Sequence, residues 1–133
     1  MTKEIPININ AVANFLPEQS IVENNRFLWC YDITIVNESD LMVQLLNRYW
    51  RITDMTGHIE VVRGPGVIGL QPIIKPGKTF SYTSFCQLIT SAGTMEGHYE
   101  MLTINDDETR FQIDIPKFIL TSPVEMGDRG RLH

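Results

Sequence analysis

Polar and apolar residues alternate with a period of two along almost the whole chain. Odd positions from 7 to 15 carry Ile, Ile, Ala, Ala and Phe, and odd positions from 27 to 35 carry Phe, Trp, Tyr, Ile and Ile. Such alternation places one set of side chains on a single face of a β-strand. We expect the odd-numbered set, which is larger and more apolar, to face the core in both strands.

Five further segments read as strands, at 43–53, 58–63, 79–84, 94–105 and 110–118. Gly57 lies in the turn between the first two and supplies the positive φ that a tight loop often needs. No segment shows a convincing helical period. About seven or eight short strands separated by turn residues predict an all-β sandwich, with a small barrel as the competing architecture.

The composition is that of one soluble globular domain. The chain has 133 residues, of which 43% are hydrophobic and 20% are charged, and its net charge is −5. The acidic balance argues against a nucleic-acid surface. No apolar run reaches the roughly 20 residues of a membrane span, and the N-terminus lacks the apolar core of a signal peptide. We therefore expect a cytoplasmic protein, with a domain at 1–121 and a disordered tail at 122–133.

The two cysteines, Cys30 and Cys86, lie within expected strands. In a cytoplasmic protein they read as reduced thiols that fill the core, and a disulfide between two sheets is the less favoured alternative. No Cys-x-x-Cys or Cys/His spacing supports zinc, and we expect no cofactor.

A glycine motif follows the expected hairpin. Gly64, Gly66 and Gly69 match the spacing of a dinucleotide-binding loop, which normally leads into a helix that binds phosphate. Pro72 follows three residues later and would break such a helix. We therefore interpret the glycines first as a loop across one edge of the sandwich.

A weaker functional interpretation of the loop is an anion site. The backbone N–H groups of a glycine-rich loop can form an anion-binding nest without a helix. Arg63, Lys75 and Lys78 lie nearby in the sequence, and Arg48 or Arg51 could reach across the hairpin. The alternative is that these cations are solvated ends of exposed strands.

Three consecutive carboxylates, Asp106, Asp107 and Glu108, could attract a hard cation such as Mg²⁺. They lack the spaced ligands and central glycine of a calcium loop, so a polar hairpin turn is the preferred interpretation. No Ser/Cys–His–acid signature is present. We therefore expect no catalytic activity.

Trp29, Tyr31, Tyr49 and Trp50 form a dense aromatic set on neighbouring strands. If Trp50 points inward with Leu46 and Ile52, Tyr49 points outward. An exposed Tyr beside Arg51 is typical of a protein-binding surface. This pattern predicts a protein partner, and an unpaired edge strand would also support a homodimer.

Ordered blocks of residues then point to a known family. They are YDITIVN at 31–37, QLLNRYWRITD at 44–54, GPGVIGLQP at 64–72, PGKTFSYTS at 76–84, GTMEGHYEM at 93–101 and IPKFIL at 115–120. On these blocks the chain resembles the bacterial ApaG family, also called CorD, over roughly residues 5–121. The chain departs from the family pattern at Phe85 and Cys86, where a glycine is expected, and an exposed Phe85 would mark a partner surface.

The resemblance implies an immunoglobulin- or fibronectin-III-like β-sandwich. It implies an accessory domain that binds proteins, loosely associated with cobalt and magnesium resistance, with no transferable metal ligands. It also leaves the glycine motif open as a nucleotide or pyrophosphate site. We expect a non-enzymatic interaction domain with Tyr49, Arg51 and Phe85 as contacts. The alternatives are binding of a phosphate-containing small molecule at residues 64–69 with Arg63 and Lys78, and divalent-cation handling.

Overall fold

The computed structural model describes residues 5–104 and 108–123. In this part of the chain eight strands and two short 3₁₀ turns are found, and no helix is long and apolar enough to cross a membrane. The 3₁₀ turns, η1 (Pro17–Gln19) and η2 (Val22–Asn24), connect the first two strands. The strands are β1 (Ile7–Phe15), β2 (Phe27–Asn37), β3 (Val43–Asp54), β4 (Ile59–Pro65), β5 (Ile73–Ile74), β6 (Thr79–Leu88), β7 (Gly93–Thr103) and β8 (Arg110–Leu120).

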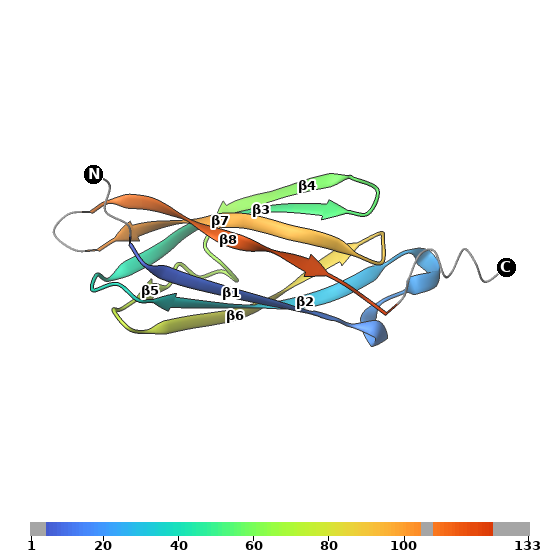
Figure 1. The fold of residues 1–133 in the computed structure, drawn as a ribbon, viewed down its shortest axis with the longest axis horizontal. Coiled ribbons are helices and arrows are strands. Elements are labelled where there is room, and N and C mark those ends of the chain that lie inside the picture. Colours follow the sequence, from blue (N-terminus) through green and yellow to red (C-terminus); the bar gives the residue numbers. More distant parts are fainter. Residues whose placement is uncertain (1–4, 105–107, 124–133) are drawn as a thin grey trace.

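The strands form two antiparallel sheets packed face to face (Figure 1). One sheet has the order β1-β2-β6, and the other has the order β4-β3-β7-β8 with β5 beside β3. This arrangement confirms the predicted fibronectin-III-like sandwich and excludes the barrel. The expected tail at 122–133 lies almost wholly outside the described residues, so the domain boundary stays a prediction.

The core forms where the alternation predicts it. The odd positions of β2 from Phe27 to Ile35 are all buried, and those of β1 are buried or pack against the core. They meet Trp50, Met95 and other apolar side chains of the facing sheet. The indole Nε1 of Trp29 donates a 2.6 Å hydrogen bond to the carbonyl of Thr121, which fastens the chain beyond β8 to β2.

A β-bulge at Leu46 changes which side chains of β3 face the core. The register of β3 against β7 shifts between Leu45 and Asn47, so Leu46 is an extra residue. Before the bulge the odd position Leu45 is buried, whereas after it the even positions Trp50 and Ile52 are buried. The expectation that Leu46 points inward with Trp50 is therefore wrong, because one inserted residue inverts the alternation.

The expectation that both cysteines fill the core is wrong for Cys30. Cys86 is buried, whereas Cys30 is half-buried and pairs across the strands with the exposed Phe85. Both lie in the same sheet but on opposite faces, so an inter-sheet disulfide cannot form and only Cys86 fills the core. Burial raises the pKa of the Cys86 thiol to about 12, which keeps it protonated and poorly reactive.

The β3–β4 turn depends on Asp54. Its Oδ1 accepts hydrogen bonds from the Thr56 hydroxyl at 2.7 Å, the Thr56 N–H at 2.8 Å and the His58 N–H at 3.1 Å. Gly57 adopts a φ of 88°, as the sequence predicts. The Thr56 hydrogen bond is the main cause that holds the pKa of the Asp54 carboxyl below its ordinary value, against an opposing effect of burial.

We predict that Asp54→Ala lowers the free energy of unfolding at neutral pH by about 1–2 kcal/mol, because three donors in the turn lose their acceptor. Since the folded pKa is depressed, this stabilisation is complete above the ordinary carboxyl pKa and disappears as pH falls through the folded value. Denaturant unfolding at neutral and strongly acidic pH measures both effects. An equal difference between the two proteins at both pH values would contradict the assignment.

Candidate functional site

One side of the sandwich is open between two edge strands. In the described part of the chain, β6 pairs only with β2 and β4 pairs only with β3, so each leaves one edge unpaired. Two hollows of about 220 and 340 Å³ lie along this side. Both are lined by Tyr31, Arg48, Trp50 and Ser84, and we call the combined depression the edge groove.

The walls of the edge groove come from both sheets. Four consecutive β6 residues, from Ser84 to Gln87, line it. Neighbouring side chains of a strand point to opposite faces of the sheet. Four consecutive residues can therefore line one groove only along the edge of the strand, so the edge of β6 forms this wall. Glu60 and Val62 of β4 form the opposite wall, and Trp50, Ile52, Met95 and Tyr31 contribute apolar surface between the walls.

Arg48 lies in the edge groove beneath the glycine motif. Its Nη1 donates to the carbonyls of Pro65 at 3.0 Å and Gly66 at 2.9 Å. Gly64 pairs with Arg48 across the strands, and a Cβ there would come within 3.2 Å of Nη1, so the missing side chain makes room for the guanidinium. The Arg48 side chain is half-buried, and neither of the two ion pairs found among the described residues includes it.

Three tyrosines lie close to Arg48. Burial raises the pKa of Tyr31, Tyr82 and Tyr99, and the positive charge of Arg48 opposes that rise in each case. The hydroxyls of Tyr82 and Tyr99 hydrogen-bond to each other between the sheets. The phenols therefore stay neutral and offer hydrogen bonds beside the cation rather than a counter-charge.

The glycine motif is a tight turn that leads into no helix. Val67 and Leu70 exchange two backbone hydrogen bonds of 2.8 Å, and the residues between them, Ile68 and Gly69, have φ of 43° and 79°. Positive φ at both central positions is the geometry of a type I′ turn. Gly66 has a φ of 62°, and a Cβ there would collide with the Leu70 carbonyl. Gly66 and Gly69 therefore meet the conformational needs of a tight turn.

Three backbone N–H groups of this segment are already engaged in hydrogen bonds within the protein. The Gly66 N–H donates to the Leu46 carbonyl at 2.7 Å, and the N–H groups of Val67 and Leu70 bond within the turn. The predicted cations do not gather there. Arg63 lies over the Tyr49 ring, 5.2 Å from its centroid, and Lys78 is exposed outside the edge groove. Among the cations weighed for this loop, Arg48 is the one that lies beneath it.

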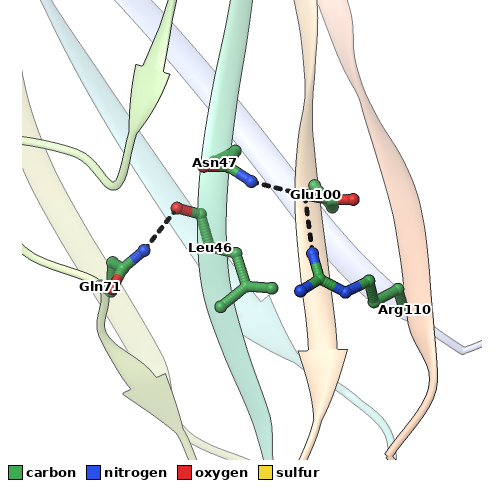
Figure 2. Close-up of polar contacts among 5 residues, drawn as sticks. All are labelled: Leu46, Asn47, Gln71, Glu100 and Arg110. Carbon is green, nitrogen blue, oxygen red and sulfur yellow. Dashed lines mark hydrogen bonds and ion pairs between the residues drawn. The ribbon is translucent and has the colours of Figure 1, made fainter.

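Tyr49 and Arg51 lie on the outer face of the larger sheet, where Tyr49 lines a hollow of about 590 Å³. Tyr49 stacks on His98, with the two ring centroids 4.8 Å apart, and the Arg63 guanidinium also lies over the Tyr49 ring. Glu100 lines the same hollow; it accepts a hydrogen bond from Asn47 and forms an ion pair with Arg110 at 3.4 Å (Figure 2). The polar groups on this face largely satisfy one another.

The three predicted contacts do not form one surface. Phe85 is 60% exposed but belongs to the other sheet, where it lines the edge groove. The carboxylates Asp106 and Asp107 lie outside the described residues, and Glu108 is exposed. Within residues 5–104 and 108–123 no cluster of three His, Cys, Asp or Glu could hold a metal ion.

Sequence reasoning missed Tyr31, Trp50 and Ser84 as lining residues. Trp50 was expected only to fill the core, and it is 2% exposed. Its Nε1 is nevertheless buried without a hydrogen-bond partner. No residue pattern signals this, because the unsatisfied donor arises from packing between strands.

Comparisons with known proteins agree with the sandwich fold described above. Residues 17–103 match the family model described as ApaG domain. The chain is 48% identical to Protein ApaG of Beijerinckia indica over 117 residues, 88% of each chain, and 43% identical to Protein ApaG of Dechloromonas aromatica over 122 residues, 92% of this chain and 94% of the other. A crystal structure of a Bordetella pertussis protein designated ApaA superposes with a TM-score of 0.86 at 34% identity, covering 92% of this chain and 98% of that one.

We predict that Ile68→Gly raises the free energy of unfolding by about 1 kcal/mol. A β-branched residue with positive φ is strained, and Ile68 is 55% exposed, so little burial is lost. Denaturant unfolding measures the change, and Ile73→Gly, at an exposed strand position without positive φ, is the control that should lose stability. A loss of stability in Ile68→Gly would show that the turn is not strained.

Proposed function

This chain belongs to the ApaG domain family, and we propose that it acts as a non-enzymatic interaction domain that binds an extended segment of a protein partner in the edge groove. The observation that carries the proposal is the pair of unpaired strand edges, β4 and β6, which frame an apolar floor. An extended segment can add its backbone to such an edge and place alternate side chains in the groove.

The edge groove suits this role better than the outer face does. Its wall on β6 is a strand edge, and unpaired strand edges readily pair with another chain. Phe85 at 60% exposure and Ile68 at 55% supply apolar surface beside it. On the outer face, by contrast, Glu100 is paired with Arg110, and the Tyr49 ring is covered by Arg63 and His98.

Binding of small anions is a second candidate function, favoured by the position of Arg48 in the groove. Calorimetric titration with pyrophosphate and ATP tests it. Saturable heat that is lost in Arg48→Gln would support this function. No heat with either ligand would leave the glycines as turn geometry. Divalent-cation handling through Asp106, Asp107 and Glu108, and with it any association with cobalt or magnesium resistance, stays a prediction, as does a cytoplasmic location.

Two neighbouring valines of β4 provide a matched test of the edge groove. Val62 lines the groove, whereas Val61 is 45% exposed and points to the opposite face. Random peptides of about eight residues, roughly 25 Å long when extended, are selected against the protein, and their affinities are then measured for the variants. We predict that Val62→Lys weakens binding by about tenfold or more while Val61→Lys leaves it unchanged.

Backbone NMR shifts induced by a selected peptide identify the surface independently of the variants. The expected shifts lie along Ser84–Gln87 and at Glu60 and Val62. Shifts centred on Tyr49, Arg51 and His98 would move the interaction to the outer face and overturn the proposal. Peptide-independent shifts in β6 that depend on protein concentration would identify a second copy of the chain as the occupant instead.

A further inference from the structure

We propose that the edge groove receives a free C-terminus, with the terminal carboxylate of the partner held by Arg48. This inference rests on the proposed function and specifies the chemistry of the segment that binds. It depends on three features of the groove: a cation and a buried donor that lack a carboxylate partner and an acceptor, respectively, among the described residues, and a turn that stands at one end.

Arg48 is a half-buried cation whose partners among residues 5–104 and 108–123 are neutral. The carbonyls of Pro65 and Gly66 accept from its Nη1, whereas the two ion pairs of the described residues are Arg110–Glu100 and Lys117–Glu96. A guanidinium has five N–H donors in a planar fork that matches both oxygens of a carboxylate. Removal of a charged group from water costs free energy when no counter-charge is present. The Arg48 guanidinium has already lost part of its hydration in the folded protein, so a carboxylate that binds it displaces less water.

Trp50 supplies the unsatisfied donor. It lies two residues after Arg48 on the same face of β3 and lines both hollows of the groove. Its Nε1 is the one buried side-chain nitrogen or oxygen in the described part of the chain that lacks a hydrogen-bond partner. Ser84, on the opposite wall, adds a hydroxyl. The residues that line both hollows with Arg48 therefore include two further hydrogen-bond donors, an indole N–H and a hydroxyl.

The turn of the glycine motif closes the groove beyond Arg48. Val67 is 1% exposed and belongs to the hydrophobic core, and Ile68 and Gly69 line the smaller hollow. A segment that runs along β6 toward Arg48 therefore meets this turn at the end of the smaller hollow. A chain terminus fits such a blind end, whereas an acidic side chain in mid-segment would need room for the chain to continue.

The remainder of the groove indicates which residues precede the carboxylate. Ile52, Cys86 and Met95 line the larger hollow, so apolar side chains suit the positions just before the terminus. Glu60 is exposed on the β4 wall and lies near Cys86. A basic side chain upstream would therefore match the charge of Glu60 while the carboxylate matches that of Arg48.

Two random peptide libraries of the same composition test the inference, one with free C-terminal carboxylates and one with C-terminal amides. We expect groove-binding peptides from the free-acid library, with apolar residues at their C-termini. Amidation of a selected peptide should weaken its binding by about tenfold or more, which is about 1.4 kcal/mol. Arg48→Gln should weaken the free acid by a similar factor and leave the amide unchanged, whereas Arg51→Gln, on the outer face, should affect neither.

A second measurement needs no variant that could fail to fold. Acetate, as the simplest carboxylate, is titrated into the wild-type protein while the NMR signal of the Trp50 Nε1–H is followed, and inorganic phosphate is titrated in parallel. Saturable movement of that signal with acetate supports the inference. Movement with phosphate alone would assign the site to phosphate and overturn it.

The failures of the two proposals are distinguishable. Equal binding of acid and amide forms, with shifts along Ser84–Gln87, would overturn the terminal-carboxylate inference and leave the interaction groove in place. If neither library yields a peptide that shifts these residues, both the inference and the proposed function are wrong.

Discussion

The β-bulge at Leu46 determines how the candidate site is built. Because one extra residue inverts the alternation of β3, Arg48 and Trp50 turn inward between the sheets while Tyr49 turns outward. At the bulge, the Leu46 carbonyl accepts a hydrogen bond from the Gly66 N–H at 2.7 Å. It accepts a second from Gln71 Nε2 at 2.9 Å (Figure 2). Arg48 then donates to the Gly66 carbonyl. One irregularity therefore orients the cation and anchors the turn above it.

The strand order of the sandwich keeps the site open. On one side β1 lies beside β8, which brings the two sheets together (Figure 1). On the other side β4 and β6 each end their sheet without a partner in the described part of the chain. Val67 fills the space between the sheets at one end of that opening. The result is a groove with two strand edges as walls, an aromatic floor and the turn of the glycine motif at one end.

Sequence patterns predicted the fold more fully than the site. Alternation in β1 and β2 identified the inward set, and Gly57 identified the turn, because both depend on local geometry. The bulge could not be predicted, since Leu45 and Leu46 are both apolar and either could face the core. Without the bulge, the sequence does not show that Arg48 faces the groove, so Arg63 was favoured because it is adjacent to the glycine motif. The structure instead turns Arg63 toward Tyr49 on the outer face. The unsatisfied Trp50 Nε1 depends on three-dimensional packing and leaves no sequence signal.

Amide hydrogen exchange along β6 tests the open edge most directly. In an antiparallel edge strand, alternate N–H groups bond to the neighbouring strand and the others face away from it. Since β2 is the one strand that pairs with β6 in the described part of the chain, slow and fast amides should alternate from Thr79 to Leu88. That alternation should not change with protein concentration. Uniformly slow exchange along this strand would show that its edge is already covered, and would contradict the account of an open groove.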